Sequence, residues 1–132
     1  MIGLDTGFFI EFLRGNSTSV SVWKALIEDR EEAVVSCLTL SELEMLSLKR
    51  GIEGATTLLE AIPAVCTVLW LRDNDILSRA AALSHGLGIS AVDSLILAGF
   101  LAERVRVIYT TDVHFESYRK KGIKVINLKL GS

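Results

Sequence analysis

The first nine residues, Met1-Ile-Gly-Leu-Asp5-Thr-Gly-Phe-Phe9, place a carboxylate directly after a short apolar run. Ile2 and Leu4 suit a buried strand, whereas Asp5 is costly to remove from water unless a metal ion or a hydrogen-bond donor holds it. Ligands of open α/β sheets bind at the carboxyl ends of the strands. We therefore expect Asp5 to belong to a site at that edge of a sheet, together with any other acids that reach it.

The composition is that of a globular protein. The 132 residues are 50% hydrophobic and 23% charged, with a formal net charge of −2 and a pI near 5.7. A chain of this length can bury a sizeable core, and we expect a single domain over residues 1–132. The mild acidity argues against a broad basic face for nucleic acid, but an acidic metal site would itself lower the total charge.

The cysteine content and the hydropathy indicate a cytoplasmic protein. Cys37 and Cys66 are too few for a disulfide framework and are expected to be reduced and buried. The chain starts with a strand-like run and shows no basic leader of the kind found in signal peptides. No apolar stretch approaches the roughly 20 residues needed to span a bilayer, so we expect no membrane contact.

Apolar runs alternate with helical spacing along the chain. Strands are expected near residues 1–4, 33–36, 65–71, 105–110 and 123–128. Helices are expected over residues 7–14, 17–31, 40–50, 52–62, 73–87, 89–104 and 112–121. Ser17 or Ser19 is expected to cap the second helix and Pro63 to end the fourth. Strands separated by helices indicate a parallel sheet that is covered on both faces.

The same periodicity assigns apolar side chains to the buried sides of these helices. Ile27 is expected to face inward, and Met45 and Leu48 are expected to form part of the apolar side of their helix. Trp23 and Trp70 are expected in the core or in an interface rather than as platforms for stacked bases.

Four acids stand where this scaffold would bring them to one edge. They are Asp5 after the first strand, Glu42 early in the helix after the second, Asp93 in the first turn of an apolar helix, and Asp112 after the fourth strand. Strand ends and the starts of the following helices share one edge, so all four converge if the helix entering at Ser90 also starts there. Carboxylates brought together repel and then take up protons or bind cations. Such hard oxygen ligands favour Mg²⁺ or Mn²⁺.

Most of these acids also have a purely structural explanation. Asp112 is a good helix N-cap, and Asp93 complements the dipole of its helix. Thr39 or Ser36 can cap the helix that begins near residue 40, and Glu42 can form a capping box with Thr39, three residues earlier. Asp5 is the hardest to explain in this way, because its neighbours predict burial. Three hydroxyls flank the acids and are suited to orient them or to bind water: Thr6, Thr110 and Thr111.

Taken in order, these segments resemble the PIN-domain ribonucleases, and within them the VapC-like toxins of prokaryotic toxin–antitoxin pairs. The matching segments are Leu4-Asp5-Thr6, Ser36-x-x-Thr39-x-x-Glu42-Leu43, Asp93-Ser-Leu-Ile-Leu-Ala98 and Thr110-Thr-Asp112-x-His114-Phe115. Each segment is weak alone, but the ordered set covers nearly the whole chain. Gly7 departs from the pattern, because the family often has a serine or another small polar residue at that position.

The resemblance implies a doubly wound α/β fold whose parallel sheet has strand order 3-2-1-4-5 and helices on both faces. It also implies an Mg²⁺- or Mn²⁺-dependent endoribonuclease whose metal ligands are Asp5, Glu42, Asp93 and Asp112, with Thr110 in support. An RNA substrate, an antitoxin partner and a homodimer are further expectations. Three basic residues near the predicted edge are candidates for contacting the RNA backbone, with plain surface solvation as the alternative: Arg14, Lys49 and Arg50.

Other functions of a similar scaffold fit less well. A haloacid-dehalogenase-type phosphatase needs a second acid two residues after the first, where this chain has Gly7. A receiver domain needs a lysine near the end of a late strand, and residues 105–111 contain none. The turn after Asp5 lacks the glycine-rich loop of a nucleotide-binding fold. A catalytically idle RNA- or protein-binding module is the alternative, and it would show little stabilisation by metal ions.

Overall fold

A parallel five-stranded sheet forms the centre of the protein. The computed structural model describes residues 1–50, 54–118 and 122–131. The strands are β1 (Ile2–Leu4), β2 (Ala33–Ser36), β3 (Thr67–Leu69), β4 (Val107–Thr110) and β5 (Lys124–Asn127). Their order is β3-β2-β1-β4-β5, and each neighbouring pair is parallel. The expected fold class and strand order are therefore confirmed.

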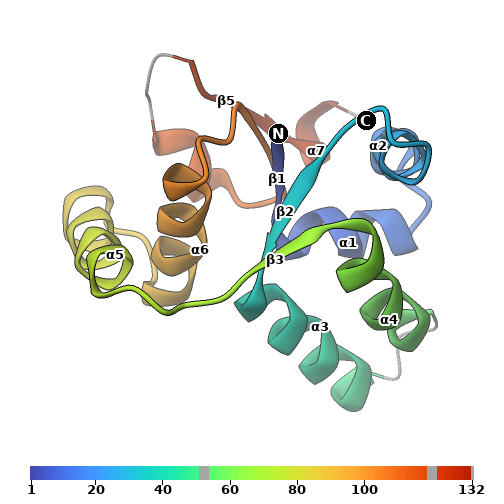
Figure 1. Ribbon diagram of the computed structural model, residues 1–132, viewed down its shortest axis with the longest axis horizontal. Helices are drawn as coiled ribbons and strands as arrows, with labels where there is room; N and C mark the ends of the chain where they lie inside the picture. The colour runs from blue at the N-terminus through green and yellow to red at the C-terminus, as the bar shows by residue number, and fades with distance from the viewer. Residues whose placement is uncertain (51–53, 119–121, 132) are drawn as a thin grey trace.

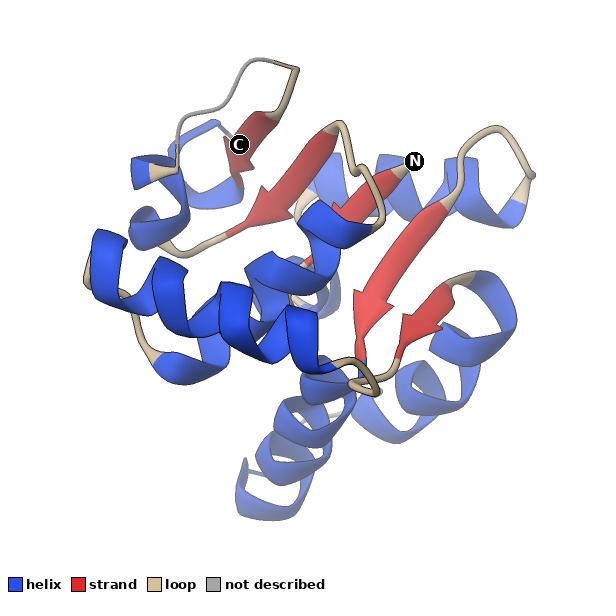
Figure 2. Cartoon of the chain, turned by 60° about the vertical axis from the view of Figure 1, so that its left-hand side comes forward, coloured by secondary structure: helices blue, strands red, loops and turns tan. Residues whose placement is uncertain are grey.

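Helices cover both faces of this sheet (Figures 1 and 2). They are α1 (Thr6–Leu13), α2 (Ser17–Ile27), α3 (Cys37–Arg50), α4 (Ala55–Val65), α5 (Asn74–Leu87), α6 (Ala91–Ala102), the 3-10 helix η1 (Val113–Ser117) and α7 (Leu128–Gly131). Figure 1 shows α1 to α4 on one side of the strands and α5 and α6 on the other. None of the described helices is long and apolar enough to cross a membrane.

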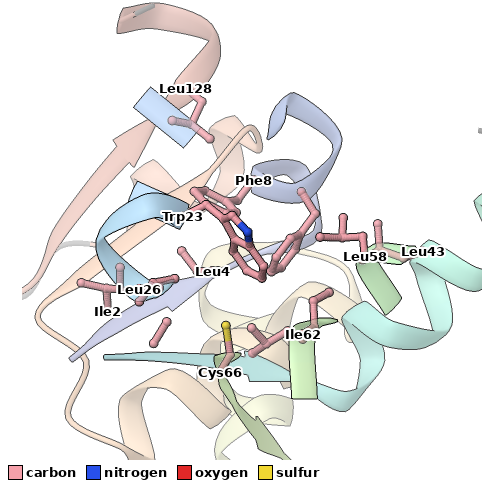
Figure 3. Packing of buried hydrophobic residues seen from close by; sticks show 13 residues of the cluster. Ile2, Leu4, Phe8, Trp23, Leu26, Leu43, Leu58, Ile62, Cys66 and Leu128 are labelled. Atoms are coloured by element: carbon pink, nitrogen blue, oxygen red, sulfur yellow. The ribbon is translucent and has the colours of Figure 1, made fainter. Parts of the chain in front are cut away.

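The alternation of side chains along the strands creates two cores. Ile2 and Leu4 of β1 belong to the first core, whereas Val34 of β2 and Ile108 of β4 belong to the second. Four helices each contribute a large side chain to the first core (Figure 3): Phe8, Trp23, Leu43 and Ile62. The second core lies under α6. β1 is therefore buried on both faces, which fixes the position of the residue that follows it.

Several expected helix boundaries differ in the structure, among them the end of α4 and the cap of α2. Pro63 lies inside α4, because the helix tolerates the missing N–H and the Cys66 N–H still bonds to the Ile62 carbonyl at 2.8 Å. Asn16 rather than a serine caps α2, its side-chain oxygen accepting from the N–H of Ser19 at 3.0 Å. An asparagine is as good a cap as a serine, and local sequence does not separate the two. The expected start of the fourth helix near residue 52 lies outside the described residues.

Several apolar side chains that were expected to be buried are exposed. Ile27 and Met45 are exposed, and Leu48 has 84% of its surface accessible. The reason is that α2 ends at Ile27, and α3 runs on beyond the end of β2 (Figure 1). Helical periodicity identifies an apolar side of a helix, but it does not show whether another element covers that side.

Gly3 provides a test of how tightly β1 is enclosed. A Cβ atom at Gly3 would lie 3.0 Å from three ring atoms of Phe100, a residue of α6 with no exposed surface. We expect Gly3→Ala to lower the free energy of unfolding by roughly 1–3 kcal/mol, because the enclosed ring has no room to move. Gly86→Ala in α5 is the matched control, because no atom lies within 4 Å of its added Cβ. Urea denaturation measures both.

The control should be neutral or stabilised by up to about 1 kcal/mol, since alanine favours helix more than glycine does. Wild-type stability of Gly3→Ala would show that the contact between α6 and β1 is looser than described.

Candidate functional site

Asp5 lies at the junction of β1 and α1 and is only 6% exposed. It caps α1, with Oδ1 accepting from the N–H of Gly7 at 3.2 Å. Thr110, the last residue of the neighbouring strand β4, donates its hydroxyl to Oδ2. Two donors therefore hold this carboxylate at the carboxyl ends of two adjacent strands, as expected for an acid that must be kept buried.

Thr110 also connects Asp5 to Asp112. Its Oγ1 accepts from the backbone N–H of Asp112 at 2.9 Å, and the residue has no exposed surface. Asp112 in turn caps η1, with Oδ1 accepting from the N–H of His114 at 2.8 Å. The exposed imidazole of His114 lies 3.0 Å from the same oxygen through Nδ1. The backbone after β4 thus presents Asp112 beside Asp5.

Asp93 approaches the same edge from α6. Ser90 caps this helix, and its Oγ accepts from the N–H of Asp93 at 3.1 Å. Burial raises the pKa of Asp93, and a side-chain hydrogen bond with Asp112 and repulsion from Asp112 and Glu42 raise it further. Two carboxyl groups share a hydrogen bond only when one of them is protonated. Because Asp112 follows β4 and affects the pKa of Asp93, the start of α6 lies at the edge of the sheet where β4 ends.

Glu42 reaches the site from α3. The hydroxyl of Thr6, at the start of α1, donates to Glu42 Oε1 over 2.6 Å. Thr39 also lies within hydrogen-bond distance of Thr6, with 3.0 Å between the two hydroxyl oxygens. Glu42 is therefore tied to the residue that directly follows Asp5.

The four acids influence one another electrostatically. Burial raises the pKa of Asp5 from 3.8 to about 6, against the lowering effect of its bonds to Thr110 and Gly7. Repulsion from Asp93 and from Glu42 adds to the increase. The structure thus brings Asp5, Glu42, Asp93 and Asp112 to a single edge of the sheet, with Thr110 between Asp5 and Asp112.

The donor set suits a divalent cation, although its side chains are hydrogen-bonded rather than arranged as ligands. Within residues 1–50, 54–118 and 122–131, no three acidic, histidine or cysteine side chains converge closely enough to hold one ion. The groups are nevertheless hard oxygens whose mutual repulsion a cation relieves. Ion binding there would require the carboxylates of these described residues to move closer together.

A family model for the PIN domain matches residues 2–121 of this chain. The chain belongs to the PIN-domain family. The match covers all four acids and confirms the resemblance seen in the ordered motifs. A comparison with functionally curated proteins found no significant match.

Solved structures with the same fold come from toxin–antitoxin systems. A toxin–antitoxin complex from Klebsiella pneumoniae is 18% identical, with a TM-score of 0.71 over 97% of this chain and 98% of that one. VapBC2 from Rickettsia felis, bound to a promoter DNA fragment, is 16% identical, with a TM-score of 0.73 over 96% and 98%. VapC20 from Mycobacterium tuberculosis, described as a toxin that cleaves the sarcin–ricin loop, is 19% identical, with a TM-score of 0.68 over 89% and 94%. At these identities the likeness shows the fold.

Ser36 rather than Thr39 precedes the first residue of α3 in this PIN domain. The sequence allows either residue as the cap of this helix, and it also allows a capping box between Thr39 and Glu42. The helix begins at Cys37, and the Oγ of Ser36 accepts from the N–H of Leu38 at 3.2 Å. The capping box is not formed, because Thr39 is fully buried and Glu42 bonds to Thr6.

The departure of Gly7 from the PIN pattern has a packing reason. A Cβ atom at Gly7 would lie 2.0 Å from Thr111 Oγ1 and 2.9 Å from Thr111 Cβ. The Thr111 side chain therefore occupies the space into which a side chain at position 7 would project. A hydroxyl is still present beside the start of α1, but it belongs to Thr111, the residue that follows β4.

The basic residues near this edge of the PIN domain have ordinary surface positions. Arg14, the residue after α1, is exposed and pairs with Glu11 at 2.8 Å, and Lys49 is exposed on α3. The side chain of Arg50 lies outside the described part of the structure. Their role in contacting RNA stays a prediction.

The protonation of Asp5 should make a pH-dependent contribution to the stability of the metal-free PIN domain. The folded pKa of Asp5, about 6, lies above its ordinary value of 3.8. The folded state therefore binds this proton more tightly than the unfolded state does. The contribution of Asp5 to stability is full below about pH 4 and is lost through pH 4–6, by an amount on the order of 2–3 kcal/mol. Asp5→Asn cannot ionise and should lack this loss.

Urea denaturation of metal-free protein from pH 4 to pH 8 measures the effect as the stability difference between Asp5→Asn and wild type. That difference should grow in favour of the variant as pH rises. Asp73→Asn, at an exposed cap of α5, is the control and should follow wild type. A constant difference across the range would mean that Asp5 titrates normally.

Proposed function

We propose that this PIN domain is a metal-dependent endoribonuclease and the toxin of a toxin–antitoxin pair. The observation that carries the proposal is the meeting of Asp5, Glu42, Asp93 and Asp112 at the carboxyl edge of the sheet. The family match supports nuclease activity. Fold neighbours described as toxin–antitoxin complexes, and one described as cleaving the sarcin–ricin loop, support the partner and RNA as the substrate class.

The four acids would hold Mg²⁺ or Mn²⁺, and Thr110 would keep Asp5 in place through its hydroxyl. A bound divalent ion would lower the pKa of water and offset the negative charge of the phosphodiester. The carboxylates would hold the ion, and one of them would take up the proton of the attacking water. The buried Asp5 and Thr110 exclude bulk water from the inner side of the site.

The proposed antitoxin would cover apolar surface that the fold leaves open. Met45 and Leu48 of α3 are exposed and line a surface hollow together with Ser41, Glu44 and Lys49. Apolar surface of this kind is typical of protein interfaces. We further propose a homodimer, which a mass measurement in solution tests, and a cytoplasmic location, where an RNA substrate would be met.

We also propose that the 132 residues form one domain, since β5, which follows the matched residues, joins the same sheet. A catalytically idle RNA- or protein-binding module is the second candidate function. It is favoured by the lack of a three-ligand cluster among the described residues.

The first experiment is an RNA-cleavage assay on structured and unstructured RNAs, with Mg²⁺, with Mn²⁺ and with a chelator. Cleavage by wild type should require a metal ion. Asp5→Asn and Asp93→Asn should each lose roughly 100-fold or more in rate, because each removes a charge that offsets several kcal/mol of the barrier when the ion is bound. Asp73→Asn is the matched control, because this exposed acid also caps a helix but lies apart from the four acids.

The outcomes separate the two candidate functions. Wild-type rates in both site variants would refute the proposed site. Stabilisation by Mn²⁺ that is lost in Asp5→Asn, without cleavage of any RNA tested, would keep the metal site and point to a different substrate. If neither cleavage nor stabilisation by metal ions is found, the idle module is the better description.

A further inference from the structure

Two threonines from different helices form a hydrogen-bonded chain that ends on Glu42. The Thr6 hydroxyl lies 2.6 Å from Glu42 Oε1 and 3.0 Å from Thr39 Oγ1. A hydroxyl has one hydrogen, and an ionised carboxylate only accepts. Thr6 therefore donates to Glu42 and accepts from Thr39. The short distance to Glu42 is typical of a charge-assisted bond.

Both hydroxyls are enclosed by the fold. Thr39 has no exposed surface, and Thr6 is almost completely buried. Each threonine sits in a helix, where its branched side chain has few conformations. Thr6 is the first residue of α1 and directly follows Asp5, whereas Thr39 lies one turn before Glu42 on α3. The chain of hydroxyls therefore links the α1 start to the α3 start above two adjacent strands, β1 and β2.

A glutamate at such a place needs an external restraint. Its side chain has three rotatable bonds, and ordering it costs about 1–2 kcal/mol of conformational entropy. Thr6 occupies one lone pair of Oε1, which leaves the second oxygen and further lone pairs of Glu42 free to accept. The same backbone segment then presents the carboxylate of Asp5 and directs the carboxylate of Glu42.

We propose that Thr6 and Thr39 are positioning residues that orient Glu42 toward the divalent ion of the proposed site. This inference rests on the proposed function, because it assigns the two hydroxyls to the same metal centre. Groups that orient metal ligands in this way contribute about 10- to 100-fold to metal affinity. A purely structural role, in which the chain of hydroxyls only joins α1 to α3, would change stability and leave metal affinity as it is.

The test is Mn²⁺ binding by titration calorimetry, with the Mn²⁺-induced shift in melting temperature as a second readout. Thr6→Val keeps the shape and removes the hydroxyl, so Mn²⁺ affinity should fall about 10- to 100-fold. Thr39→Val leaves Thr6 without its donor and should cost less, about 3- to 10-fold. Thr6→Ser restores the hydroxyl and should bind within about threefold of wild type. Thr57→Val, at an exposed threonine of α4, is the matched control.

The outcomes distinguish the positioning role from the metal site itself. If Thr6→Val and Thr39→Val have lower melting temperatures without metal but bind Mn²⁺ like wild type, the positioning role is overturned and the proposed function is untouched. If Asp5→Asn also binds Mn²⁺ like wild type, or wild type does not bind it, the metal site itself fails, and the positioning role fails with it. Should Thr6→Val not fold, Thr39→Val and Thr6→Ser decide the question on their own.

Discussion

The buried carboxylate of Asp5 is the constraint on which the rest of the site depends. β1 lies in the middle of the sheet and is enclosed on both faces, so the residue after it emerges into a place already surrounded by other elements. Water cannot solvate this acid fully, and its charge is held by the Gly7 N–H and the Thr110 hydroxyl. The central position of β1 also explains why acids from α3, α6 and the end of β4 can all reach it.

Holding several carboxylates together opposes folding in the absence of a cation. The protein reduces this cost locally, through hydroxyl donors to Asp5 and Glu42 and backbone N–H donors to Asp5 and Asp112. Natural proteins accept such conflicts mainly at functional sites, where activity requires them. This conflict supports the shared cation proposed above, and it goes beyond what helix capping explains, even though Asp5 and Asp112 do cap α1 and η1.

Threonines recur beside the acids for a common physical reason. Thr6 donates to Glu42, and Thr110 donates to Asp5 while accepting from the N–H of Asp112. A threonine hydroxyl can donate and accept at the same time, and its branched side chain is stiff. It therefore fixes one acid relative to another without adding charge to a site that already has too much of one sign.

Local patterns in the sequence determined the alternation of strands and helices, and the ordered motifs determined the PIN family, the strand order and the four acids. These features depend on short motifs and on the spacing of apolar residues, which recur every two residues in strands and about every four in helices. Both can be seen in the sequence without knowledge of the fold. Tertiary structure alone decided that Pro63 stays inside α4, that Leu48 is uncovered, and that Thr39 bonds to Thr6. Whether a helix side is covered, and which hydroxyl meets a residue 33 positions away, depends on the path of the whole chain.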